Sequence, residues 1–149
     1  MSDQILITGG CGYVGSRLVE SLVNNYKVTV FDTQWFGNYL KRNKNLNIIK
    51  GDIRFDLEKL NFSNFKSVIH LANIANDPSV ELDQTLSWEV NVLSSKKLIE
   101  KSISAGVENF IFASSGSVYG IKDEQEVTED LDLFPISVYN KTKMISERV

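Results

Sequence analysis

With 149 residues, of which 42% are hydrophobic and 23% charged, the chain fits one globular domain that buries a core without disulfides or a structural metal. No apolar run approaches the ~18 residues of a membrane span. The net charge of -3 gives no general attraction for nucleic acid or anionic membranes. Cys11 is the only cysteine and no secretory signal is visible, so we expect a cytoplasmic protein without a nucleic-acid or membrane partner.

Short β-branched and apolar runs alternate with helical stretches along the chain. The predicted strands are, in chain order, residues 4–8, 27–32, 46–52, 67–72 and 108–115. The predicted helices are residues 12–24, a short segment at 55–60, a long helix at 81–105 that ends at Gly106, and a last helix at 137–149 capped by Ser137. Two polar segments, 33–45 and 121–136, are long enough to form functional lids. The alternation predicts right-handed βαβ crossovers, and hence a Rossmann-type, doubly wound parallel α/β sheet of about five strands.

The stretch TGGCGYVG, residues 8–15, directly follows the first predicted strand. It fits two spacings, G-x-G-x-x-G through Gly10, Gly12 and Gly15, and G-x-x-G-x-x-G through Gly9, Gly12 and Gly15. In both, glycines allow a tight turn and close approach of a ligand to the backbone. The helix that follows points its free N–H groups and the positive end of its dipole at a pyrophosphate. Placed between a strand and a helix, the loop predicts a dinucleotide site.

An acidic residue, Asp32, ends the second predicted strand twenty residues after Gly12. A carboxylate at this place accepts both hydroxyls of the adenosine ribose and repels a 2′-phosphate, so it favours NAD over NADP. No basic residue lies within the glycine loop or directly after Asp32, although Lys41, Arg42 and Lys44 could fold back toward it. NADP is therefore disfavoured.

Near the end of the chain, YNKTK places Tyr139 and Lys143 four residues apart. With this pair added, the sequence resembles the extended short-chain dehydrogenases/reductases, the NAD-dependent epimerase/dehydratase family, which acts mostly on nucleotide sugars. The resemblance covers the whole chain. It rests on the following segments in the family's order: TGGCGYVG, Asp32, GDIR, VIHLA, the asparagine of EVNVLSS, ASSGSVYG and YNKTK.

The resemblance selects the G-x-x-G-x-x-G spacing and implies a role for individual residues. The catalytic residues it implies are Ser115, Tyr139 and Lys143. Asp52 and Ile53 would flank the adenine, and Asn91 would stabilise the active-site region from the long helix. The cofactor-binding set is Gly9, Gly12, Tyr13, Val14, Gly15, Asp32, Asp52, Ile53, Leu71, Ala72, Asn91, Tyr139 and Lys143.

The chemistry of a tyrosine–lysine pair follows from its spacing. Residues four apart on a helix share one face, so the ammonium group of Lys143 can sit beside the phenol of Tyr139. A phenol is a poor base at neutral pH, and a neighbouring cation together with a positive nicotinamide ring favours the phenolate. Tyr139 then takes a proton from a sugar hydroxyl as the carbon gives hydride to NAD. Ser115 would hydrogen-bond the same oxygen, and Lys143 would also hold the nicotinamide ribose.

The residues after Ser115 narrow the reaction. Dehydratases of the family that the sequence resembles typically carry an acidic pair directly after this position, where the chain has Gly116 and Ser117. Without a carboxyl group, the extra acid–base steps of an elimination have no obvious donor. We therefore favour a nucleotide-sugar epimerase. The alternatives are a nucleotide-sugar dehydrogenase or reductase, and a non-catalytic dinucleotide-binding module.

Four further features carry separate expectations. Asn73 replaces the small apolar residue that usually follows HLA in the family that the sequence resembles, and we expect it to alter the wall near the nicotinamide. His70 is expected to be a packed, hydrogen-bonded residue, and a chain with one histidine and one cysteine has no familiar zinc site. Cys11 is expected to fill a small-side-chain position rather than act as a nucleophile. The aromatic cluster is expected either to cover the adenine or to pack on the sheet edge, and it comprises Trp35, Phe36 and Tyr39.

The last feature is the end of the sequence, which falls within a predicted helix. The family that the chain resembles continues beyond its Tyr–Lys helix into a small domain that grips the nucleotide sugar. We therefore expect a cofactor-binding domain over residues 1–149, truncated before the C-terminal substrate domain, with weak or absent turnover on its own. The resemblance also implies a homodimer through the long helix and the last helix, although the latter is cut short.

Overall fold

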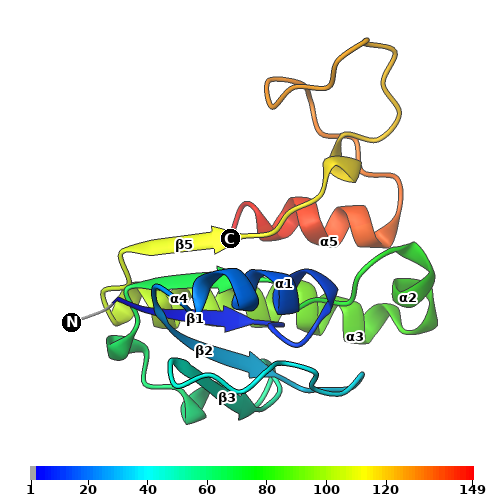
Figure 1. Cartoon of the computed structure of the whole chain (residues 1–149). Helices are drawn as coiled ribbons and strands as arrows, with labels where there is room; N and C mark the ends of the chain where they lie inside the picture. Colours follow the sequence, from blue (N-terminus) through cyan, green and yellow to red (C-terminus); the bar gives the residue numbers. More distant parts are fainter. Residues whose placement is uncertain (1–2) are drawn as a thin grey trace.

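The computed structural model describes residues 3–149 as one sheet with helices on both faces (Figure 1). The sheet has five parallel strands in the order β3-β2-β1-β4-β5. The strands are β1 (Gln4–Thr8), β2 (Lys27–Asp32), β3 (Leu46–Lys50), β4 (Ser67–His70) and β5 (Asn109–Phe112). The chain runs outward from β1 to β3 and then crosses back to β4 and β5, which places a change of direction beside β1. The predicted doubly wound α/β fold is confirmed.

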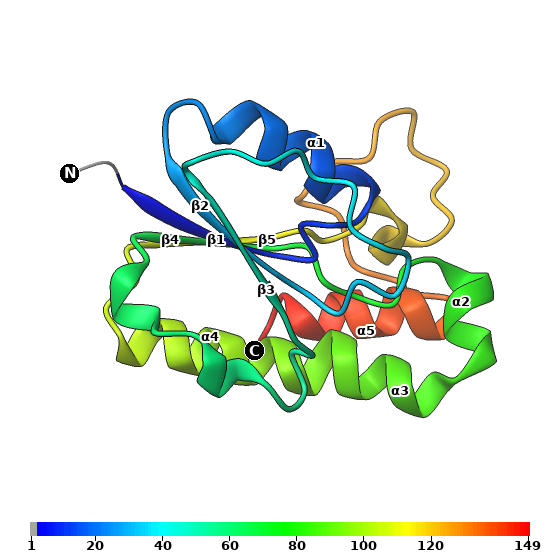
Figure 2. The ribbon, with the colours of Figure 1, turned by 60° about the horizontal axis from the view of Figure 1, so that its bottom comes forward.

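Successive side chains along each strand point to opposite faces of the sheet, where they form two separate hydrophobic cores. Ile5 and Ile7 of β1 point to one face, which α1 (Tyr13–Leu22) covers with Val19. Leu6 points to the other face, where it joins Leu98 of α4 (Ser94–Ser104). Figure 2 shows α1 on one side of the sheet and α3, α4 and α5 (Val138–Ser146) on the other. The strands at the centre are therefore buried on both faces, as a parallel sheet requires.

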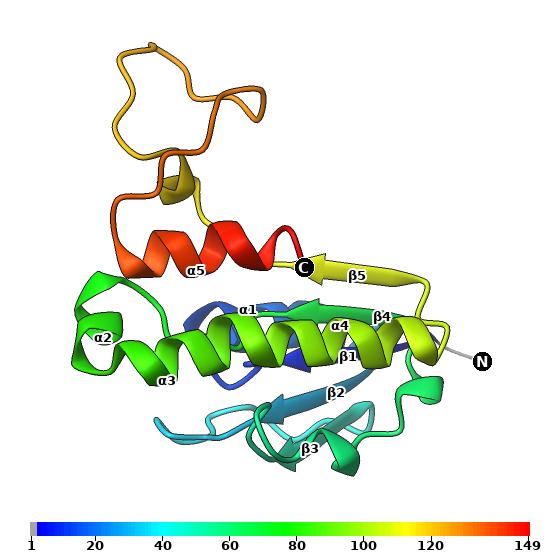
Figure 3. The ribbon, with the colours of Figure 1, turned by 180° about the vertical axis from the view of Figure 1, so that it is seen from behind.

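The long helix predicted at 81–105 is wrong as a continuous element. The structure divides it into α2 (Asp77–Leu82), α3 (Gln84–Trp88), a π-helical turn η3 (Glu89–Leu93) and α4, which Figure 3 shows in succession along one face. The first break lies at Asp83, which has an extended backbone and accepts a hydrogen bond from the N–H of Leu86. Aspartate competes with the helix for backbone N–H groups in this way, so it begins a new helix instead of continuing the old one.

Most other predicted elements are present with shorter bounds. Strands β3, β4 and β5 end at residues 50, 70 and 112, two or three residues before the predicted ends. The predicted segment at 55–60 is replaced by two 3₁₀ turns, η1 (Leu57–Lys59) and η2 (Phe62–Asn64). The predicted caps are confirmed, since Gly106 has φ +75° after α4 and the Ser137 side chain accepts from the N–H of Asn140 at the start of α5. Among residues 3–149, no helix combines the length and apolar character that a membrane crossing requires.

The segment between β5 and α5 leaves the body of the domain. After the 3₁₀ turn η4 (Gly116–Tyr119), residues 121–136 project beyond the helices in Figures 1 and 3. The returning chain is tied to η4 by a hydrogen bond from the N–H of Phe134 to the carbonyl of Val118 (3.0 Å). This tie sets where α5 starts, and α5 then packs against α2, α3 and η3.

Candidate functional site

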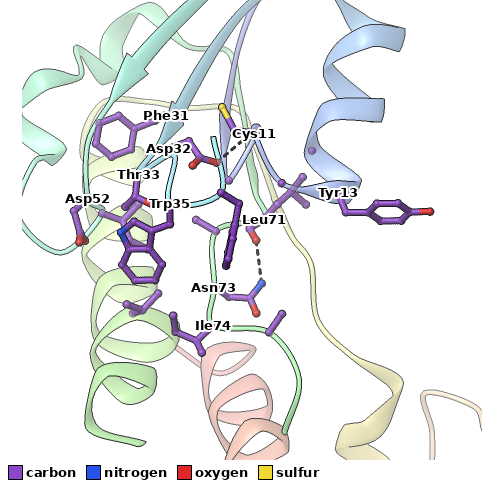
Figure 4. A pocket seen from close by; sticks show the side chains of 18 of the residues that line it. Cys11, Tyr13, Phe31, Asp32, Thr33, Trp35, Asp52, Leu71, Asn73 and Ile74 are labelled. Carbon is purple, nitrogen blue, oxygen red and sulfur yellow. Dashed lines mark hydrogen bonds between the residues drawn. The ribbon is translucent and has the colours of Figure 1, made fainter. Parts of the chain in front are cut away.

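A cavity of about 310 Å³ opens at the carboxyl ends of β1, β2 and β4, beside the change of direction in the sheet. Ligands of open parallel sheets bind at such a place. Figure 4 shows it between Trp35 and the glycine loop. Ten of the predicted cofactor residues line it: Gly9, Gly12, Tyr13, Val14, Gly15, Asp32, Asp52, Ile53, Leu71 and Ala72.

The glycine loop is packed so tightly that two of its glycines have no room for a side chain. A Cβ on Gly15 would lie 2.3 Å from the carbonyl oxygen of Gly9, and one on Gly9 would lie 2.6 Å from the backbone nitrogen of Ala72. Gly9 also has φ +73°, a conformation that glycine adopts without strain. Gly10 plays a different part, because its Cβ would meet the side chain of Val30 at 2.7 Å. Both candidate spacings therefore contain glycines for which the packing leaves no room for a side chain.

Helix α1 begins directly at this loop and has no side-chain cap. Its N-cap residue is Gly12, and there is no acidic residue in its first turn. The N–H groups of a first helical turn lack intrahelical partners, and the helix dipole adds positive charge there. Because the loop also lacks side chains that would fill the space, the cradle fits the pyrophosphate of a dinucleotide.

The carboxylate of Asp32 is fixed beside the loop by two backbone hydrogen bonds. The N–H of Cys11 donates to its Oδ2 (3.0 Å), and the N–H of Gln34 donates to its Oδ1 (2.7 Å). Each oxygen keeps a further lone pair for a hydroxyl donor. Burial and the charge of Asp32 raise the pKa of the Cys11 thiol to about 11. Cys11 therefore stays a thiol at neutral pH, which disfavours a nucleophilic role.

Asp52 lies on the β3 side of the cavity and is held by a residue that the sequence analysis gave no role. Its carboxylate accepts from the backbone N–H of Arg54 (2.9 Å) and pairs with the guanidinium (2.8 Å), which also reaches Glu89 (3.2 Å). Burial opposes ionisation of Asp52, but the hydrogen bonds and charge of Arg54 outweigh it and lower the pKa of Asp52. Arg54 was visible in GDIR, but its partner Glu89 is 35 residues away and gave no signal.

Of the aromatic cluster, two members reach the cavity. Trp35 and Phe36 line it while remaining exposed, and the exposed Tyr39 lies against Gly37 instead. The structure thus places the first two over the site and not against a sheet edge. Tyr13 lines the rim, and its ring points outward in Figure 4.

The three predicted catalytic residues, Ser115, Tyr139 and Lys143, lie outside this cavity, where the chain after β5 meets α5. Lys143 donates from Nζ to the carbonyl of Ala113 (2.8 Å). Two residues later, Ser115 Oγ contacts Ser117 Oγ (2.7 Å), which donates to Oδ1 of Asn140 (2.7 Å). The segment around Ser115 is therefore bound to α5 through Asn140 and Lys143, and Tyr139 itself is half-buried.

Lys143 is a buried cation with few partners. Its side chain is 2% exposed, and its Nζ lies 4.7 Å from the centroid of the Phe112 ring. Burial lowers the pKa of Lys143 to about 8, while the charge of Glu147 acts weakly in the opposite direction. A buried ammonium favours any anion that forms beside it.

Asn91, predicted to bind cofactor and to support the site, is 1% exposed and lies in the π-helical turn behind the cavity. Its side chain accepts from the N–H of Ile74 (2.8 Å) and donates to the carbonyl of Ile74 (3.0 Å) and to Oγ1 of Thr142 (3.1 Å). It thus joins the loop after β4 to α5. Because these bonds use both N–H donors of its amide and one lone pair of its oxygen, the geometry fits its supporting role better than direct cofactor contact.

His70 is buried and hydrogen-bonded, as predicted. Its Nδ1 meets Oγ1 of Thr8 (2.6 Å), and its Nε2 meets Oγ of Ser95 (2.8 Å), which donates to the carbonyl of Asn91 (2.7 Å). Since the Ser95 hydrogen is used on that carbonyl, Nε2 must carry the ring proton and Nδ1 must accept from Thr8. Burial, and then the charge of Lys143, lower the pKa of His70 to about 3, so the ring is neutral.

Comparison with known proteins identifies the family of this chain. The sequence model of the NAD dependent epimerase/dehydratase family matches residues 5–149. The chain belongs to that family. It is 35% identical over 147 residues to a putative UDP-glucose 4-epimerase of Methanocaldococcus jannaschii, covering 96% of this chain and 48% of the relative.

Solved structures of family members have the same fold. A UDP-N-acetylglucosamine 4-epimerase from Methanobrevibacter ruminantium, in complex with UDP-N-acetylmuramic acid, superposes with a TM-score of 0.92 at 32% identity, over 99% of this chain and 49% of that one. A Thermus thermophilus UDP-glucose 4-epimerase in complex with NAD gives a TM-score of 0.85 at 30% identity, over 97% and 49%. The chain spans about half the length of these relatives.

Proposed function

We propose that this chain forms the NAD-binding unit of a nucleotide-sugar 4-epimerase. The observation that carries the proposal is the cradle at the start of α1. Three features converge there: glycines without room for side chains, an uncapped helix start, and a carboxylate fixed by two backbone N–H groups. The three similar proteins named above are 4-epimerases of UDP-sugars, one of them putative, and one of the three was solved with NAD.

Each half of the dinucleotide has residues suited to it. Asp32 would accept the hydroxyls of the adenosine ribose, and Asp52 and Ile53 would border the adenine beneath Trp35. Val14 and Gly15 at the start of α1 would donate N–H groups to the pyrophosphate. The nicotinamide half would extend toward the β5 side of the sheet, since Lys143 and Tyr139 lie there on α5.

NAD, when bound, supplies the acceptor and then the donor of the hydride. Tyr139 takes the proton of the sugar hydroxyl, and Ser115 hydrogen-bonds the same oxygen. Lys143 favours the phenolate form of Tyr139, which accepts this proton and becomes the neutral phenol, because a buried ammonium with one carbonyl partner gains from a neighbouring anion. Gly116 and Ser117 occupy the positions where dehydratases of this family have acidic residues. The lack of acids supports epimerisation over elimination.

The cofactor part of the proposal is tested by calorimetric titration of NAD and NADP into the purified chain. We expect NAD to bind, and NADP to bind at least tenfold more weakly because Asp32 repels its 2′-phosphate. An Asp32→Asn variant should narrow that difference, since it removes the charge and keeps one oxygen acceptor. Failure of the wild-type chain to bind NAD, or equal binding of NADP, would overturn this assignment.

The chemical part is tested by single-turnover formation of NADH after addition of UDP-glucose to the NAD-loaded chain. Because residues that position the sugar contribute strongly to rate, we expect slow turnover from a chain that spans half of its relatives. Tyr139→Phe should abolish the signal while leaving the affinity for NAD within about twofold. Tyr26→Phe, in the loop after α1, is the matched control. Equal rates in the wild type and Tyr139→Phe would rule out the proposed base.

A further inference from the structure

One polar atom of the cavity wall lacks a hydrogen-bond partner. Asn73 lines the cavity on the β4 side, and its Nδ2 donates to the carbonyl of Leu71 (2.9 Å), as the dashed line in Figure 4 marks. Its Oδ1 is the only buried side-chain nitrogen or oxygen atom within residues 3–149 that makes no hydrogen bond. A buried acceptor left in this state is unfavourable, so groups of this kind call for a specific explanation.

The backbone around Asn73 is fixed on both sides, so the loop itself does not relieve the unpaired oxygen. The N–H of Leu71 donates to the carbonyl of Thr8 (3.0 Å), and Ala72 packs against Gly9. On the other side, both backbone groups of Ile74 are bound by Asn91. The side chain has only its bond to Leu71 to lose. A change of rotamer that turned the oxygen toward the cavity would therefore exchange one neutral hydrogen bond for another.

The position of Asn73 in the sheet indicates which part of a dinucleotide it would meet. Asp32 and Asp52 follow β2 and β3, on one side of the glycine loop. Asn73 follows β4, on the other side of β1 and next to β5. A dinucleotide that crosses the edge of the sheet with its pyrophosphate at α1 leaves its adenosine with the acids and its nicotinamide half with Asn73.

We propose that Asn73 is a cofactor-binding residue whose Oδ1 accepts a hydrogen bond from the nicotinamide half of NAD. The donor is either a hydroxyl of the ribose beside the nicotinamide or the N–H of its carboxamide. This inference rests on the proposed NAD site. It adds a side-chain contact at a position where the family resemblance leads one to expect a small apolar residue.

The test is a calorimetric titration of NAD, ADP-ribose and ADP into the wild type, Asn73→Ala and Asn73→Leu. Leucine keeps the approximate volume without an acceptor. Loss of one neutral hydrogen bond should weaken the affinity for NAD about three- to tenfold. The affinity for ADP, which lacks the nicotinamide half, should change by less than about twofold. Asn64→Ala, on an exposed turn, is the matched control and should change neither. Melting temperatures serve as a second readout of folding, because both Asn73 variants also lose the hydrogen bond to the carbonyl of Leu71.

The outcomes separate the two proposals. If the wild type binds no NAD, the proposed function fails, whatever the variants do. If the wild type binds NAD and both Asn73 variants bind it equally well, the site stands and the role of Asn73 is overturned. Equal weakening of NAD and ADP would also overturn it, because the effect would then act on the adenosine half or on the loop. Weakening of ADP-ribose together with NAD assigns the ribose hydroxyl, and weakening of NAD alone assigns the carboxamide; both support the proposal.

Discussion

The buried cation Lys143 should make the stability of the chain depend on pH in a direction opposite to that of an ordinary salt-bridged lysine. Its pKa falls from 10.5 to about 8 on folding, mainly through burial. Between these values the unfolded chain binds one more proton than the folded chain, so the free energy of unfolding rises with pH. The penalty is fully present below pH 8 and disappears above pH 10.5. A shift of this size corresponds to about 3 kcal/mol.

The variant Lys143→Met isolates that contribution. It removes the titrating group and keeps a long side chain against Phe112, and the bond to the carbonyl of Ala113 is lost together with its donor, the ammonium group. Urea unfolding should be measured between pH 7 and 10.5 for both proteins. The free energy of unfolding of the wild type minus that of the variant should rise by about 3 kcal/mol over that range.

Two controls exclude other titrations. Lys141→Met changes an exposed lysine on the same helix, and its difference from the wild type should stay flat with pH. Cys11, whose pKa rises on folding, lowers stability above pH 9, but it is present in every protein and cancels in the differences. A difference between the wild type and Lys143→Met that varies by less than about 1 kcal/mol would refute the conclusion that burial suppresses the charge of Lys143.

Two further predictions concern the glycine loop and the last helix. Gly15→Ala places a Cβ 2.3 Å from the carbonyl oxygen of Gly9, so it should destabilise the fold by about 1–3 kcal/mol in urea unfolding and remove most of the affinity for NAD. Gly116→Ala, with no atom within 4 Å of its Cβ, should do neither, and wild-type behaviour of Gly15→Ala would contradict the packing argument. Ser137→Ala deletes the side chain that caps α5 and should lower the free energy of unfolding by about 1 kcal/mol. An unchanged melting curve would show that α5 does not depend on this cap.

The parts of the fold set by local patterns could be predicted from the sequence. The β-branched runs gave the five strands because strands buried on both faces read as continuous apolar segments. The glycine spacing gave the turn into α1, since only glycine fits where a Cβ would strike the carbonyl of Gly9. Ser137 and Gly106 gave helix ends for equally local reasons. Each of these signals lies within a few residues of the structure it determines.

The parts of the structure that were predicted wrongly or not at all depend on which of several hydrogen bonds a side chain forms, or on contacts between distant residues. Asp83 lies inside the helix predicted at 81–105, but its side chain accepts a hydrogen bond from the N–H of Leu86 and begins a new helix. The π-helical turn was not predicted, because it depends on the hydroxyls of Ser94 and Ser95, which donate to the carbonyls of Glu89 and Asn91. The ion pair from Arg54 to Glu89 and the unpaired oxygen of Asn73 arise from tertiary packing and leave no mark on sequence periodicity.

The buried polar residues also explain how two separate parts of the site keep a fixed relation. The N–H of Ala72, beside Gly9, donates weakly to Oγ1 of Thr8 (3.4 Å), and Thr8 donates to His70. The imidazole ring of His70 donates from Nε2 to Oγ of Ser95, and Ser95 donates to the carbonyl of Asn91. The hydroxyl of Ser146 on α5 also donates to that carbonyl (2.6 Å). In this series of hydrogen bonds, the hydroxyls of Thr8 and Ser95 each donate once in the direction of Asn91. Reversing one of these bonds would leave a buried group unpaired. The loop that would hold the cofactor and the helix that carries Tyr139 and Lys143 are therefore joined through the core, on a path that does not cross the cavity.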